Sequence, residues 1–275
     1  MIFDSHLHLF RHGYRFGRES PLQGQTDVDA YEALMARHGI GGGIVVCYEA
    51  HGIDPGNNAY VRGLAAERPW ITSVAYLDAN APPDPEAIER LLSDGHAGIA
   101  LYLADADAAN ALARWPAGSW QLLSRSRAIV SLNARPQAIA ALEPIVVGAS
   151  GCQFLFAHLG LPGAQEQRPS IAIARQGLAP LLSLASVGNV GVKISGLYAV
   201  DPRPPHAGAA AFVEALVEVF RPTDLHWGSD FSPALEFVSF EDSLELAWLS
   251  VLPQPHLRLI MGEGLALKLR RAGQL

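Results

Sequence analysis

Residues 2–10 read IFDSHLHLF, an apolar run interrupted by one aspartate, one serine and two histidines. Because side chains alternate along a β-strand, this pattern predicts a buried strand with Asp4, His6 and His8 on one face. Two imidazoles on one strand face can converge on a single metal ion or a single substrate oxygen. Two hydrogen-bonded structural histidines would give the same pattern. Other residues of the chain are therefore needed to distinguish a functional site from structural histidines in the core.

The composition is that of a folded protein with a large core. Of the 275 residues, 49% are apolar and 17% are charged, which excludes a disordered chain. The net charge is −7 and no segment concentrates Lys or Arg, so neither nucleic acid nor an anionic membrane surface is an expected partner. No apolar run is long enough for a membrane helix, and the N-terminus lacks the pattern of a secretory signal. Cys47 and Cys152 lie in apolar segments, which favours reduced, buried thiols in a cytoplasmic protein.

Seven further apolar segments resemble the first, and each is followed by a segment with helical periodicity. The expected strands are 42–48, 71–77, 98–103, 128–134, 153–158, 190–195 and 225–229. The expected helices are 27–38, 57–67, 85–92, two pieces within 106–125 divided at Pro116, then 137–147, 170–186, 207–220, 240–252 and 256–271.

Eight strand–helix units in succession predict an α/β fold, a single (β/α)₈ TIM barrel over residues 1–275 with an extra helix at its C-terminus. The strands are continuous apolar runs, as expected of a parallel sheet that helices cover. An open, doubly wound sheet is the alternative fold. It needs fewer strands and a Gly-rich turn after the first one, where this chain has HLHLFRHG.

Polar residues at the carboxyl ends of the strands would face one mouth of such a barrel, where active sites in this fold lie. His158 follows the apolar run FLFA, and Asp230 follows LHWGS. Together with His6 and His8, they predict a pocket of three imidazoles and one carboxylate. Lys193 could point into the barrel or toward the helices, and the sequence does not say which. The candidate substrate-binding residues at the same rim are Tyr48, His51, Asn133, Arg135 and Tyr198.

Four segments in this order, DSHLHLF, FLFAHLG, KISGLY and WGSD, resemble the motifs of the amidohydrolase-related TIM-barrel hydrolases. Within that family they are most similar to the branch of 2-pyrone-4,6-dicarboxylate lactonase and the sugar lactonases. The terminal MGEGLALKL is also similar, with Gly264 in place of the usual Asn. The resemblance implies that His6, His8 and His158 hold or polarise a scissile carbonyl and that Asp230 activates water.

The metal content implied by the resemblance is open. Many relatives have a further histidine on strand five or a lysine on strand four, where this chain has Asn133 and Leu101-Tyr102. We therefore do not expect two metal ions. One divalent ion, Zn or Mn, would suit the ligands His6, His8, His158 and Asp230, but the pyrone lactonase branch is also associated with catalysis without metal.

The substrate pocket departs from that branch. Ala100 and Ala199 stand in regions where the pyrone lactonases carry arginines that grip carboxylates bidentately. A lactone or ester with less charge than a pyrone dicarboxylate is the expected substrate.

We weigh three functions on these grounds. A hydrolase that opens a lactone of a small organic or sugar acid is the main hypothesis. A metal-dependent decarboxylase of an aromatic or muconate-type acid is the alternative, and a barrel that binds a small ligand without turning it over is the third. All three have a small-molecule partner, and the sequence leaves a homodimer open.

Overall fold

The fold is that of a (β/α)₈ barrel, as the sequence predicts. In the computed structural model of the chain, residues 1–14, 21–22, 24–50, 53–244, 249 and 252–274 are described. Eight parallel strands form one sheet in chain order. They are β1 (Ile2–Leu7), β2 (Ile40–Val46), β3 (Ile71–Tyr76), β4 (Gly98–Leu103), β5 (Ile129–Ala134), β6 (Gln153–Phe156), β7 (Val190–Ile194) and β8 (Leu225–Trp227).

The segment that follows β8 joins the sheet's two edges. The amide of Asp230 donates to the carbonyl oxygen of His6 over 2.8 Å, and Leu7 forms a parallel bridge with Phe231. The ring is therefore closed by the same two segments that carry His6 and Asp230, which brings residues from the two ends of the chain together.

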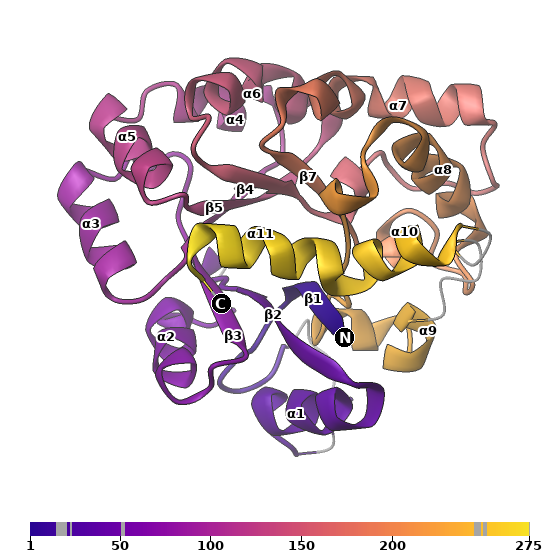
Figure 1. Ribbon diagram of the computed structural model, residues 1–275, viewed down its shortest axis with the longest axis horizontal. Helices are drawn as coiled ribbons and strands as arrows, with labels where there is room; N and C mark the ends of the chain where they lie inside the picture. The colour runs from indigo at the N-terminus through magenta and orange to yellow at the C-terminus, as the bar shows by residue number, and fades with distance from the viewer. Residues whose placement is uncertain (15–20, 23, 51–52, 245–248, 250–251, 275) are drawn as a thin grey trace.

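Helices surround the strands (Figure 1). They are α1 (Asp27–His38), α2 (Asn57–Glu67), α3 (Pro85–Ser93), α4 (Ala106–Leu112), α5 (Ala117–Arg125), α6 (Pro136–Gly148), α7 (Ile171–Ser183), α8 (Ala210–Val219), α9 (Phe240–Leu244), α10 (Gln254–Arg258) and α11 (Gly264–Ala272). Local chemistry sets their ends. For example, Thr26 caps α1 by accepting from the amide of Asp29, and Gly39 ends it at φ 68°, a conformation that glycine adopts without a Cβ clash.

The barrel interior is filled by small and branched side chains, and α11 covers one of its ends. Leu265, Ala266 and Leu269 of α11 join a buried cluster with Phe3 of β1 and Ile129 of β5, residues near the amino ends of their strands. In Figure 1, α11 lies in the foreground across the strands. Because α11 covers the amino-terminal end, the carboxyl-terminal end of the barrel is the one that can hold an active site.

Two segments that the sequence predicts as single helices differ in the structure. The segment 256–271 is not one helix, because a π-helical turn at Leu259–Glu263 separates α10 from α11. Gly262 there has the non-helical φ of 152°. A Cβ on it would lie 2.3 Å from the backbone nitrogen of Phe3, so only glycine fits against β1 at this position. The expected helix 240–252 begins as α9, but much of the remainder lies outside the described residues.

The side chain of Asp4 does not point where strand alternation predicts. The pairing of β1 with β2 shifts register between Asp4 and Leu7, so the simple alternation is broken. The carboxylate of Asp4 accepts from the hydroxyl of Tyr31, on α1, over 2.8 Å and from the amide of Ser229 over 3.0 Å. It therefore faces α1 and the segment after β8 instead of sharing a face with His6 and His8.

Cys47 and Cys152 are free and buried, as expected. Among the helices that the structure describes, none has the length and apolar character needed to cross a bilayer.

Candidate active site

His6, His8, His158 and Asp230 meet at the carboxyl-terminal end of the barrel. Asp230 Oδ1 lies 3.5 Å from His6 Nε2 and 3.6 Å from His8 Nε2, and its Oδ2 lies 4.0 Å from His158 Nε2. The two Nε2 atoms of His6 and His8 are 3.2 Å apart. All four residues are at most 7% exposed. The structure thus brings together the four residues that the sequence nominated from three separate strands.

The backbone at the strand ends turns these side chains inward. His158 and Asp230 follow β6 and β8 in left-handed conformations, with φ 54° and 57°, which are uncommon for residues other than glycine. Gly196 follows β7 at φ 56°, and a Cβ on it would lie only 2.2 Å from His158 Nδ1. A glycine at this position leaves the space that the His158 ring occupies.

A second layer of hydrogen bonds orients the imidazoles. His8 Nδ1 lies 2.6 Å from the carbonyl oxygen of Val46. A carbonyl can only accept, so Nδ1 carries the proton and Nε2 presents a lone pair to the centre. His158 Nδ1 lies 3.1 Å from Ser195 Oγ. The hydroxyl of Tyr198 donates to Asp230 Oδ2 over 2.6 Å.

Lys193 points into the barrel, which the sequence left undecided. Its Nζ donates to Ser131 Oγ over 2.7 Å and lies 3.1 Å from His6 Nδ1. The side chain is fully buried. Lys193 therefore sets the position of the His6 ring from below.

Burial dominates the electrostatics of the centre. It lowers the pKa of His8 and of His158 to about 4 each, and lowers the pKa of His6 well below its ordinary value. Burial raises the pKa of Asp230 to about 6, against the opposing influence of His8, Tyr198 and Lys193. At neutral pH the centre therefore holds an ionised carboxylate beside neutral imidazoles.

The donor set fits one divalent metal ion. Two ligands on a tetrahedral zinc ion lie about 3.3 Å apart, close to the distances of 3.2, 3.5 and 3.6 Å among His6 Nε2, His8 Nε2 and Asp230 Oδ1. Donor atoms of His6, His158 and Asp230 also lie within 4.8 Å of one another. The proton on His8 Nδ1 leaves Nε2 free to ligate, an arrangement common around metal-binding histidines.

The candidate substrate-binding residues are placed less uniformly. Tyr198 hydrogen-bonds Asp230, as described above, and Tyr48 lies in an aromatic cluster at the rim, with its ring centroid 4.6 Å from that of Tyr102 and 5.5 Å from that of Tyr76. Asn133 is half-buried and Arg135 is exposed. Neither makes a hydrogen bond or an ion pair to the four-residue centre within the described part of the chain. His51 lies outside the described residues.

The sequence does not identify Ser131 as part of a site, and it places Ser195 only among the polar residues at the end of its strand. Ser131 shares a strand face with Asn133, two residues on, so strand alternation could have placed it inside the barrel. Ser195 lies in the motif KISGLY, but a serine hydroxyl at a strand end is as common in structural roles as in functional ones. Tyr76 and Tyr102 lie in expected strands, where an aromatic residue alone does not indicate a site.

Comparison with known proteins settles the family. The model of the amidohydrolase family matches residues 3–263, nearly the whole chain. The chain belongs to the amidohydrolase family. A search of curated proteins gives no match.

Solved amidohydrolase structures share the fold at low identity. The chain is similar to an amidohydrolase from Burkholderia multivorans with bound zinc, at 22% identity and TM-score 0.74, covering 97% of this chain and 98% of that one. It is also similar to a protein from Acinetobacter baumannii, named as a probable 2-pyrone-4,6-dicarboxylic acid hydrolase with citric acid bound. That match has 18% identity and TM-score 0.72, and it covers 99% of both chains.

Proposed function

We propose that this amidohydrolase-family protein is a hydrolase that opens a lactone, the cyclic ester of a small organic or sugar acid. The observation that carries the proposal is the convergence of one carboxylate and three imidazoles at the carboxyl end of the barrel, with Asp230 Oδ1 3.5 and 3.6 Å from two of them. Ester hydrolysis needs a base for water and hydrogen-bond donors or a Lewis acid for the carbonyl oxygen. The name of the Acinetobacter relative supports the same reaction class.

In the proposed reaction, Asp230 takes a proton from a water molecule as the water oxygen attacks the lactone carbonyl. Negative charge then develops on the carbonyl oxygen. His6 and His158, when their Nε2 atoms are protonated, donate hydrogen bonds to that oxygen. The ring C–O bond breaks, and the departing alkoxide takes the proton back from Asp230. The product is a hydroxy acid.

The supporting residues keep these groups in place. Tyr198 holds Asp230 Oδ2, which leaves Oδ1 to face the imidazoles and the attacking water. Lys193 and Ser195 fix the rings of His6 and His158 from the sides remote from the substrate. Groups that are already oriented need no reorganisation as charge develops.

One divalent metal, if held, would be bound by His6, His8 and Asp230, with His158 beside them. Such an ion would polarise the carbonyl as a Lewis acid and lower the pKa of water. The zinc-bound Burkholderia relative supports testing this.

The rim supports a substrate with little charge. Of the Lys and Arg side chains in the described ranges, only that of Lys193 hydrogen-bonds a residue of the centre. The rim carries instead the aromatic cluster Tyr48, Tyr76 and Tyr102. We therefore propose an uncharged lactone ring rather than a dicarboxylate, with turnover in the cytoplasm, which two free, buried cysteines support.

The test is a panel of sugar lactones and aromatic lactones, with acid release followed by a pH indicator. Asp230→Asn should lose activity by about 100-fold or more, because it removes the base. Asp78→Asn is the matched control, since Asp78 is exposed just after β3 at the same rim. If no lactone is opened faster by the wild type than by Asp230→Asn, the proposal is wrong.

Metal analysis of the same preparation separates the two forms of the proposal. One equivalent of zinc or manganese in the wild type, reduced in His8→Ala, supports the metal-assisted form. Activity that is unchanged after chelation and metal-free gel filtration supports the form without metal.

A further inference from the structure

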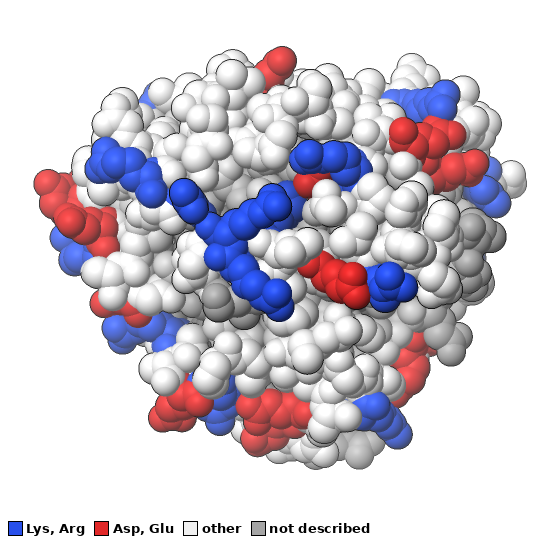
Figure 2. Space-filling model, in the orientation of Figure 1, with Lys and Arg blue, Asp and Glu red and all other residues white. Residues whose placement is uncertain are grey.

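A second concave surface lies at the opposite end of the barrel from the candidate active site. It is a groove of ≈ 640 Å³ between the segments that precede β5 to β8 and helix α11. Its described lining contains five cationic side chains and one carboxylate. The cations are Arg125, Arg127, Arg221, Lys268 and Arg271, and the carboxylate is Asp224. Figure 2 shows Lys and Arg side chains gathered near the centre of this face.

Asp224 balances only part of this charge. Its Oδ1 lies 2.8 Å from Lys268 Nζ and its Oδ2 lies 2.6 Å from Arg221 Nε. Arg127 donates to the carbonyl oxygen of Arg271 over 2.8 Å, which ties the segment before β5 to α11. Within the described ranges, no carboxylate forms an ion pair with Arg125, Arg127 or Arg271.

Among the described residues, three guanidinium groups thus share one groove without an acidic partner, in a chain whose net charge is −7. Clustered like charges repel each other and are stabilised by a multivalent anion. A guanidinium matches phosphate oxygens bidentately, and clusters of arginine recur at phosphate sites. The volume of the groove lies within the range of small-molecule sites, roughly 300–1,000 Å³.

We propose that this basic groove binds a small anion that carries two or more adjacent phosphate groups. Nucleic acid is the less favoured occupant, because it needs an extended basic stripe, and the chain as a whole is acidic. The site is distinct from the candidate active site, since the groove lies at the amino-terminal end of the barrel, beside α11, and the barrel interior separates the two. The proposal therefore does not depend on the reaction proposed above.

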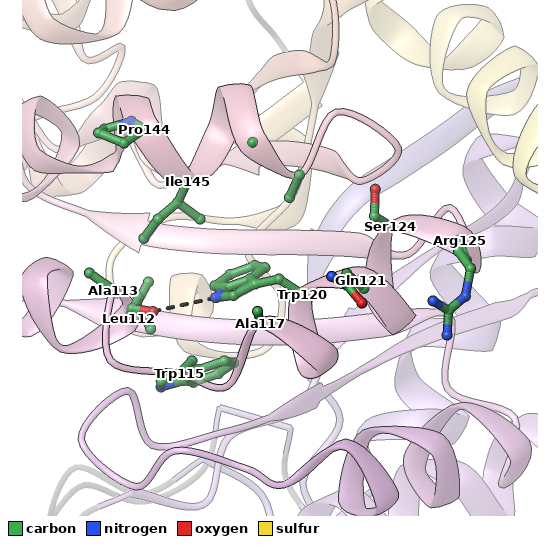
Figure 3. A pocket seen from close by; sticks show the side chains of 12 residues that line it. Leu112, Ala113, Trp115, Ala117, Trp120, Gln121, Ser124, Arg125, Pro144 and Ile145 are labelled. Atoms are coloured by element: carbon green, nitrogen blue, oxygen red, sulfur yellow. Dashed lines mark hydrogen bonds between the residues drawn. The ribbon is translucent and has the colours of Figure 1, made fainter.

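A neighbouring groove bears on the source of the phosphates. Ser124 and Arg125 also line a hollow of ≈ 510 Å³ between α5 and α6, which contains Trp120. Figure 3 shows Trp120 in this hollow and Arg125 at its end. A nucleoside polyphosphate could place its ring near Trp120 and its phosphates in the basic groove, whereas inorganic polyphosphate would fill the basic groove alone.

The test is isothermal titration calorimetry at low ionic strength with sodium tripolyphosphate, and in parallel with adenosine triphosphate. The test variant is Arg125→Gln/Arg271→Gln, which keeps the Arg127 hydrogen bond to the main chain. The control variant is Arg114→Gln/Arg270→Gln, which removes the same charge from exposed arginines outside the groove. Circular dichroism confirms that each variant is folded.

We expect tripolyphosphate to bind the wild type and the control alike, and the test variant about tenfold or more weakly, since each lost charged hydrogen bond has a large effect. Tighter binding of adenosine triphosphate, with quenching of tryptophan fluorescence, would identify a nucleotide as the source; equal binding would identify the phosphate chain alone. Both results support the proposal. No binding at about 1 mM, equal loss in the two variants, or tighter binding of a single-stranded oligonucleotide would overturn it.

Discussion

Gly196→Ala should disable the candidate active site by displacing one imidazole. The Cβ of the alanine would lie 2.2 Å from Nδ1, 2.8 Å from Cγ and 2.9 Å from Cε1 of His158. Since such contacts ordinarily exceed about 3.4 Å, the ring has to move by about 1 Å. That movement breaks the 3.1 Å contact between His158 Nδ1 and Ser195 Oγ. A misplacement of about 1 Å costs on the order of 100-fold in rate.

The variant also carries a backbone cost that a control can isolate. Gly196 has φ 56° and ψ 35°, and Gly39 has nearly the same conformation, φ 68° and ψ 36°. A Cβ on Gly39 would meet nothing within 4 Å. Both alanine variants should lose about 1 kcal/mol of stability to the left-handed backbone, but only Gly196→Ala also loses the position of His158.

The assay is steady-state kinetics on the best lactone of the panel, with urea denaturation of each variant. We expect Gly39→Ala to keep wild-type kcat/KM and Gly196→Ala to lose about 100-fold. If Gly196→Ala retained activity within a few-fold of Gly39→Ala while both were folded, His158 would not act where the structure places it.

Three further predictions follow from single contacts. Tyr198→Phe removes the donor to Asp230 but keeps the ring stacked on Phe237. We expect kcat to fall about 10-fold or more and the unfolding free energy to fall by about 1–3 kcal/mol, because a buried carboxylate oxygen loses its donor. A stability loss with unchanged kcat would contradict this. Lys193→Met should lower kcat about 10-fold or more and should also lower the unfolding free energy, because His6 Nδ1 and Ser131 Oγ lose their buried partner. Kinetics and urea melts check it, and an unchanged kcat would contradict the positioning role of Lys193. Burial lowers the pKa of His96 to about 4 in the folded protein, from the ordinary value of 6.5 in the unfolded chain. The stability that the neutral His96 contributes is therefore complete above pH 6.5 and is lost as the pH falls toward 4. Between pH 7.5 and pH 5, the wild type should lose about 2 kcal/mol more unfolding free energy than His96→Gln in urea melts, and equal pH profiles of the two proteins would contradict this.

The sequence could predict the barrel and the four central residues because both rest on local patterns. Each strand is a separate apolar run. In a closed parallel barrel, a polar group at the carboxyl end of such a run lies at the mouth of the barrel. His158 and Asp230 were found in this way. The same logic failed for Asp4, because the register shift in β1 cannot be read from alternation.

Features that depend on contacts between distant segments could not be predicted. The direction of Lys193 depends on its strand's rotation in the barrel, and the π-helical turn before α11 depends on how closely β1 passes Gly262. The basic groove joins cations from α5, the segment before β5, the segment after α8, and α11. No single stretch concentrates them, so a basic surface could not be predicted from the sequence.

The most direct test of the hydrolase account is turnover of an active lactone in ¹⁸O-labelled water, with mass spectrometry of the product. Attack of water on the carbonyl predicts one labelled oxygen in the new carboxylate and none in the released hydroxyl group. Label in the hydroxyl group, or release of CO₂ in place of a hydroxy acid, would contradict the role given to Asp230 and the three histidines.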